Sequence, residues 1–181
     1  MKKLMVIVAV AMAAIASQAA TFKWSTTSTG KIYEAGTSTL LASGTAYFFD
    51  QDVVSQASLV TAFAAGKLDL SKQTAVDSNT ISAGALAAKT ATYGEVGSSY
   101  TFYLAVLTDD GLYIGPTKTA AGYDGKDTAV SFSAKTSSQA AALDASAGYA
   151  GAGWYAAVPE PTSGLLMLLG IAGLALRRRR A

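Results

Sequence analysis

Short apolar stretches alternate with polar positions from residue 21 to residue 157, and Gly, Ser and Asp separate them. Residues 21–24 and 31–33 place polar and apolar side chains in turn, a period of two that predicts half-buried strands. Residues 45–49 (Thr-Ala-Tyr-Phe-Phe) follow a glycine and are rich in aromatics, so they predict a buried strand. Residues 129–134 alternate again and predict a further strand.

A β-hairpin is the clearest feature of the pattern. Residues 99–107 and 112–115 are two β-prone runs, and they flank the turn sequence Asp-Asp-Gly at 109–111. Glycine accepts the positive φ that a tight turn needs, and aspartate tolerates it. Pro116 lacks a backbone N–H and therefore limits how far the second strand can pair.

One helix is predicted at residues 54–65, where Asp52 or Ser55 can cap the first turn. A second, shorter helix is expected at 137–145. Residues 67–89 are diluted by Ser, Thr, Ala and Gly, so they predict a loop with one weak strand.

Residues 151–157 predict a last strand that places Trp154 or Tyr155 against the core. About eight short strands with one or two short helices are typical of a mainly β fold. We therefore expect residues 20–157 to form one exported β-rich domain, a single antiparallel β-sandwich or a small barrel.

The first 19 residues have the three parts of a secretory signal peptide. Two lysines are followed by an unbroken apolar run at 4–15, and Ser17 and Ala19 are the small residues at positions −3 and −1 of a cleavage site after Ala19. The alternative is an uncleaved anchor. Twelve apolar residues span only about 18 Å as a helix, well short of the roughly 30 Å bilayer core, which favours cleavage.

The segment at 158–181 combines three features in order. The prolines of its Val-Pro-Glu-Pro start favour an extended, accessible tether. Residues 164–176 are all Gly, Ala, Leu, Ile or Met and predict a C-terminal transmembrane helix, although one of only about 20 Å. A stop-transfer cluster follows, which keeps this end cytoplasmic and the domain on the far side of the membrane; it consists of Arg177, Arg178, Arg179 and Arg180. A core helix of a soluble domain would need an amphipathic pattern, which this segment lacks.

These residues resemble the PEP-CTERM sorting signal of exported proteins of diderm bacteria. The resemblance rests on Pro159, Glu160 and Pro161, on the Gly-containing apolar segment and on the terminal arginines. It implies recognition and processing by an exosortase-type membrane enzyme after passage through the secretion machinery. It implies no activity for the domain at 20–157.

Composition narrows what that domain can do. Residues 21–157 hold eight lysines against eleven acidic residues, a net charge of −3, so nothing indicates a nucleic-acid partner. The chain has no cysteine and no histidine, which excludes disulfides, Cys-ligated zinc, a thiol nucleophile and a Ser-His-Asp triad.

Carboxylates are then the remaining catalytic or metal-binding candidates. Paired acids could hydrolyse a glycoside, but Asp109 and Asp110 are better explained as turn formers. Asp50 with Asp52, or Asp124 with Asp127, could offer oxygen ligands to calcium, but neither pair lies in a recognised calcium-loop pattern. We predict no catalytic residue, no bound metal and no cofactor.

Two functions remain. The first is a non-enzymatic cell-surface or extracellular-matrix protein, sorted by its C-terminal signal, with exopolysaccharide as a candidate partner. The alternative is a carbohydrate-binding module that stacks exposed aromatic side chains on sugar rings. The chain has nine tyrosines, but most lie inside β-like runs, where packing is their ordinary role.

Overall fold

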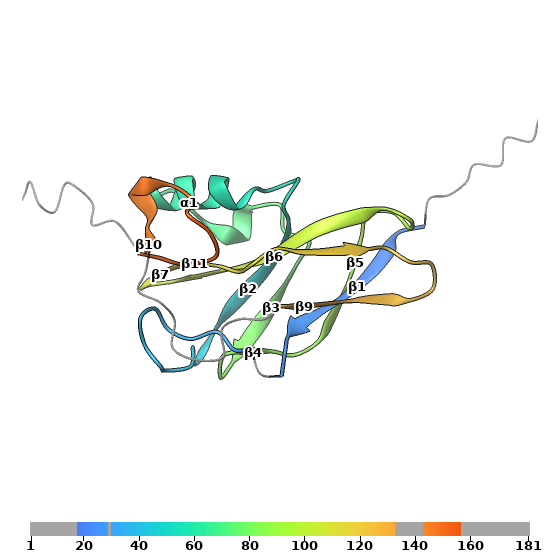
Figure 1. Cartoon of the computed structure of the whole chain (residues 1–181), viewed down its shortest axis with the longest axis horizontal. Helices are drawn as coiled ribbons and strands as arrows, with labels where there is room; N and C mark the ends of the chain where they lie inside the picture. The colour runs from blue at the N-terminus through green and yellow to red at the C-terminus, as the bar shows by residue number, and fades with distance from the viewer. Residues whose placement is uncertain (1–17, 29, 133–142, 157–181) are drawn as a thin grey trace, which may run out of the picture.

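The computed structural model describes residues 18–28, 30–132 and 143–156. They form two β-sheets and one α-helix (Figure 1). A three-stranded sheet has the order β5-β1-β9, and a larger sheet has the order β10-β11-β7-β6-β2-β3-β4, with β8 also paired to β6. The strands are β1 Ala20–Thr26, β2 Ser43–Asp50, β3 Asp77–Ser82, β4 Ala85–Leu86, β5 Lys89–Tyr93, β6 Ser99–Thr108, β7 Gly111–Ile114, β8 Lys118–Ala121, β9 Asp127–Phe132, β10 Leu143–Asp144 and β11 Gly153–Ala156.

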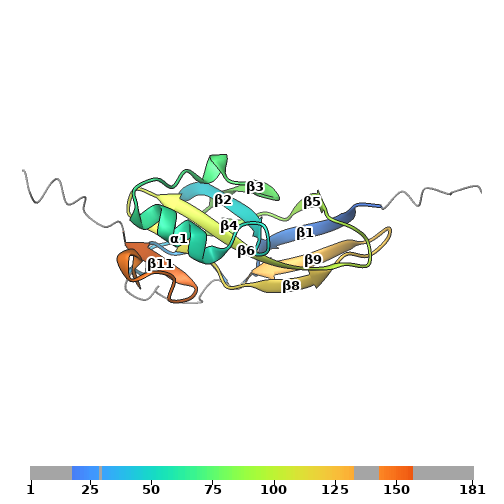
Figure 2. The ribbon, with the colours of Figure 1, turned by 90° about the horizontal axis from the view of Figure 1, so that it is seen from above.

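Two neighbouring strands, β2 and β6, are buried on both faces. On one face, Phe48 and Phe102 belong to an apolar cluster completed by residues of the three-stranded sheet, including Phe22 and Trp24. Alternate side chains of the same two strands join a second cluster, which the helix α1 (Gln56–Ala64) covers. The layers are therefore the small sheet, the large sheet and the helix, which lies over the large sheet in Figures 1 and 2. Burial on both faces explains why β6 is a continuous apolar run.

The predicted hairpin is confirmed as β6 and β7, joined by the turn at 109–110. The β6 strand pairs with β7 through Ala105 and Ile114, and with β8 through Phe102 and Lys118. The register differs by one residue between these two stretches, so one extra residue lies between β7 and β8, next to Pro116. The proline thus ends the pairing of β7, as expected, because it cannot donate to the ladder.

The helix predicted at 54–65 is confirmed as α1, and Ser55 rather than Asp52 is its cap. The Ser55 side chain accepts a hydrogen bond from the Ser58 backbone N–H at 3.1 Å. Leu59 and Val60 are buried against the large sheet. Such a cap satisfies one of the amide groups that a helix start leaves without a partner.

The strands predicted at 21–24, 45–49, 129–134 and 151–157 correspond to β1, β2, β9 and β11 where they are described. Three predictions of individual elements are corrected. Residues 31–33 form no strand and contribute one isolated bridge between Tyr33 and Leu40. Residues 67–89 hold β3, β4, the start of β5 and a 3-10 turn at Leu70–Lys72.

The third correction concerns the helix expected at 137–145. Its first six residues lie outside the described part of the chain, and the rest form β10 and the start of a 3-10 turn at Ala145–Ala147. The sheets are also neither wholly antiparallel nor closed into a barrel. The pairs β1–β9 and β10–β11 run parallel, and β9 joins the three-stranded sheet beside β1 although seven strands separate the two along the chain.

Residues 1–17 of the signal peptide predicted at 1–19, and the whole C-terminal segment predicted at 158–181, lie outside the described residues. Among the residues that are described, no helix is both long and apolar enough to cross a membrane. The first strand, β1, begins at one end of the long axis and β11 ends at the other, as both views show (Figures 1 and 2).

Substituting Phe48 tests the layer between the two sheets. Its ring stacks on Trp24 at a centroid distance of 5.0 Å and contacts Phe102 at 4.6 Å. We expect Phe48→Ala to lower the free energy of unfolding by about 3–5 kcal/mol in urea denaturation, because it leaves a cavity in a fully buried site. Val53→Ala is the matched control: that side chain is 53% exposed, and a change within about 0.5 kcal/mol is expected. Equal effects of the two substitutions would contradict this packing.

Candidate functional site

The sorting segment follows directly on the last strand of the domain. Ala156 ends β11 and pairs with Gly111 of β7 and with Asp144 of β10. Tyr155, its neighbour, is fully buried. Pro159, Glu160, Pro161 and the four arginines lie outside the described residues, as does Ser17. Only two residues therefore separate an internal strand of the large sheet from the first proline of the motif.

Asp50 is the one carboxylate among the buried residues of the described chain, with 3% of its surface exposed. It ends β2 and accepts a hydrogen bond from the Tyr93 hydroxyl at 2.9 Å and one from the Asp52 backbone N–H at 2.9 Å. Asp52 itself is exposed. Both oxygens of Asp50, which was weighed with Asp52 as a possible calcium ligand and set aside, thus have hydrogen-bond partners within the protein.

The other predicted carboxylates are exposed turn or strand-end residues. Asp109 and Asp110 form the β6–β7 turn, as the sequence suggested. Asp124 lies in the β8–β9 connection, and Asp127 begins β9, where its Oδ2 accepts a 3.4 Å hydrogen bond from the Thr90 hydroxyl. Within the described ranges, no three Asp, Glu, His or Cys side chains gather as a metal site.

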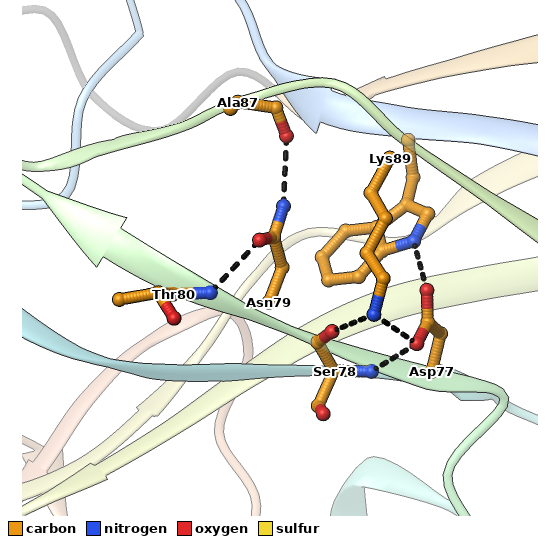
Figure 3. Close-up of polar contacts among 7 residues, drawn as sticks. Asp77, Ser78, Asn79, Thr80, Ala87 and Lys89 are labelled. Atoms are coloured by element: carbon orange, nitrogen blue, oxygen red, sulfur yellow. Dashed lines mark hydrogen bonds and ion pairs between the residues drawn. The ribbon is translucent and has the colours of Figure 1, made fainter.

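A polar network between β3 and β5 joins the two sheets, and sequence reasoning missed it (Figure 3). Asp77 begins β3 and accepts a hydrogen bond from the buried Trp24 Nε1 at 3.1 Å. Its other oxygen pairs with Lys89 Nζ at 2.6 Å, and the same ammonium donates to the Ser78 carbonyl. A third link ties Asn79 Nδ2 to the Ala87 carbonyl at 2.8 Å.

Together, Asp50 and Asp77 hold both ends of β5. Lys89 is the first residue of β5 and pairs with Asp77, whereas Tyr93 is its last residue and bonds to Asp50. Both carboxylates belong to the large sheet, and β5 belongs to the small one. These contacts link residues 12 and 43 positions apart, so no local pattern could have predicted them. Their partners are all within the protein, which is the arrangement of a structural contact.

Gln56 makes a similar link on the helix side of the large sheet. Its buried amide donates to the Gly115 carbonyl at 2.8 Å and accepts from the Tyr149 hydroxyl at 2.7 Å. The ring of Tyr149 stacks on Tyr155 at 6.2 Å. The segment between β10 and β11 is therefore tied to both the helix and the β7–β8 junction.

Burial raises the pKa of several tyrosines. The pKa of Tyr93 rises to about 12, first because the phenol is desolvated and second because it donates to Asp50. Burial alone raises the pKa of Tyr113 to about 12, and it also raises the pKa of Tyr103, whose hydroxyl donates to the Val54 carbonyl. These phenols are neutral structural groups at physiological pH.

Few aromatic side chains are available to a ligand in the described part of the domain. Tyr123 and Tyr149 are the exposed ones, at 58% and 38%, and the hydroxyl of Tyr149 is already bonded. Tyr123 lies in the connection between β8 and β9, at one end of the molecule, whereas the segment after β10 lies at the other (Figures 1 and 2). The two tyrosines do not form a common stacking platform.

Comparison with known proteins identifies the C-terminal segment. Residues 157–180 match the family model described as the PEP-CTERM protein-sorting motif. No curated protein and no solved structure matches the chain. The chain thus carries a PEP-CTERM sorting motif, which confirms the resemblance seen in the sequence, and the match begins one residue after β11 ends.

The network at Asp77 predicts that substituting Asp77 and substituting Lys89 lower the free energy of unfolding by unequal amounts. Asp77→Ala leaves the buried Trp24 Nε1 without its acceptor, so we expect a loss of about 1–3 kcal/mol in the free energy of unfolding. Lys89→Met removes an ion pair whose lysine side chain is 44% exposed, so at most about 1 kcal/mol is expected, and less at high salt. Urea denaturation at two salt concentrations measures both. Equal losses, insensitive to salt, would contradict the assignment.

The raised tyrosine pKa values predict a loss of stability in alkali. The pKa of a tyrosine phenol is near 10 in the unfolded chain, and that of Tyr93 is about 12 in the folded one. The neutral Tyr93 phenol therefore contributes its full stabilisation of the folded state below pH 10. That contribution disappears as the pH rises from 10 towards 12. We expect the urea midpoint to fall between pH 9 and pH 11.5, and to fall less in Tyr93→Phe, although this variant starts lower because Asp50 loses a donor. An equally steep fall in the variant would show that Tyr93 is not involved.

Proposed function

We propose that this chain is an exported protein whose folded domain reaches the cell surface or extracellular matrix through its PEP-CTERM signal. The single observation that carries the proposal is the match of residues 157–180 to the sorting motif. An exosortase-type membrane enzyme is the partner that processes this tail. The match begins at the residue that follows the last residue of β11.

Both ends of the chain indicate the same membrane topology. A cleaved N-terminal signal sends the β-rich domain through the secretion machinery. Arg177, Arg178, Arg179 and Arg180 then retain the C-terminus on the cytoplasmic side, because positive residues next to an apolar segment resist translocation. The apolar segment is shorter than the hydrocarbon core, which suits a transient anchor that is later processed.

The arrangement of the domain fits attachment through its last strand. The β11 strand ends at one end of the long axis, and β1 begins at the other (Figures 1 and 2). While the tail is in the membrane, the β11 end lies closest to it and the β1 end points away. The connection between β8 and β9 shares that distal end and is the part of the described domain best placed to meet a matrix partner such as exopolysaccharide.

We further propose that the domain has no enzymatic activity of its own. Its buried or half-buried carboxylates, Asp50 and Asp77, are bonded to Tyr93, Trp24 and Lys89. Each of these contacts joins the two sheets, so a structural role accounts for the carboxylates. The carbohydrate-binding alternative has less support, because the exposed tyrosines of the described chain lie at opposite ends of the domain.

Replacing Pro159, Glu160 and Pro161 by alanine tests the sorting role. We expect the full-length variant to accumulate as an unprocessed, membrane-associated form, because the processing enzyme no longer recognises the tail. Immunoblots of membrane and extracellular fractions measure both size and distribution. The matched control carries Thr162→Ala and Ser163→Ala, which alter the same segment but keep the motif, and it should be processed like the parent chain. Unchanged size and distribution in the triple variant would overturn the proposal.

A further inference from the structure

The start of β1 is enclosed by two loops at the distal end of the domain. Ala20, the first residue of β1, is completely buried. Gly122, in the connection between β8 and β9, lies so close that an added Cβ would collide with the Ala20 Cβ and meet the Glu95 carbonyl. The Gly97 N–H donates to the Gly122 carbonyl at 2.9 Å, which ties the two loops to each other.

The residue two positions before β1 takes part in the same arrangement. The Val96 backbone N–H donates to the Gln18 carbonyl at 2.9 Å. Gln18 and Ala19 are exposed, so the chain leaves the buried site at Ala20 and reaches solvent within these two residues. The ordered backbone of the domain therefore begins before β1.

Cleavage after Ala19 would disturb this end. It would make Ala20 the N-terminal residue and place an ammonium group, with an ordinary pKa near 8, on a residue that packs in the core. Charged groups are costly to place where water is displaced. It would also remove Gln18 and leave the Val96 N–H without its acceptor.

The sequence offers a second cleavage site three residues earlier. Ala14 and Ala16 are small residues at positions −3 and −1 of a cut after Ala16, which satisfies the same rule as Ser17 and Ala19. We propose that signal peptidase cleaves the Ala16–Ser17 bond, so that the exported protein begins at Ser17. Water adds across this peptide bond, leaving a carboxylate on Ala16 and an ammonium on Ser17. The charge then lies ahead of two exposed residues, and Gln18 keeps its hydrogen bond to Val96.

The inference rests on the proposed export of the domain, and N-terminal sequencing separates the two. The full-length chain is expressed in a diderm host, and the N-terminus of the exported protein is determined by Edman degradation and intact mass. We expect a sequence that begins Ser-Gln-Ala-Ala. A start at Ala20, or at any residue other than Ser17, overturns the assigned site but leaves export intact. A chain that retains Met1 overturns export as well.

Paired leucine variants provide an independent test. Ala16→Leu places a large residue at position −1 of the proposed site, so the product beginning at Ser17 should disappear. Ala19→Leu changes an exposed residue that the proposed cut leaves in the exported protein, so cleavage should proceed as in the parent chain. The opposite pattern, with cleavage blocked only by Ala19→Leu, would show that the bond after Ala19 is the one cut.

Discussion

The β2–β6 pair is buried on both of its faces, and each face determines what must lie against it. Phe48 and Phe102 face the three-stranded sheet, whereas Phe49 and Tyr103 face the helix. A strand pair that is apolar on both sides cannot be exposed to water on either, so the fold needs two covering layers. The order of the layers follows from this requirement.

Apolar packing alone would leave the small sheet free to slide over the large one, since hydrophobic contact is not directional. The polar contacts of β5 are directional and fix the position of the small sheet on the large one. Its first residue, Lys89, meets Asp77, and its last, Tyr93, meets Asp50. Trp24 connects this polar edge to the core, because its ring stacks on Phe48 while its Nε1 donates to Asp77. Hydrogen bonds of this kind add modest net stability but are expensive to leave unmade, so they favour one register.

Local patterns made the hairpin, the buried strand β2 and the capped helix predictable. The run from Ser99 to Thr108 and the Ser55 cap each depend on residues a few positions apart. The short strands β3, β4 and β8 are rich in Ser, Thr and Ala and have no clear period, so only their partners reveal them. Parallel pairing of β1 with β9, and the Asp77–Trp24 bond across 53 positions, depend on the assembled fold. The sorting motif could be identified from the sequence because it is a linear signal.

The two ends of the domain are held by different contacts. At the C-terminal end, Tyr155 is buried in a strand with neighbours on both sides, and the sorting motif begins within three residues of it. At the N-terminal end, the Gln18 carbonyl is bonded to a loop before the first strand begins. Packing therefore limits how close to the first and last strands the chain can be cut. A cut that reaches Ala20 or Ala156 changes the sheets themselves, whereas a cut outside Gln18 and Ala156 leaves every described strand and its pairing unchanged.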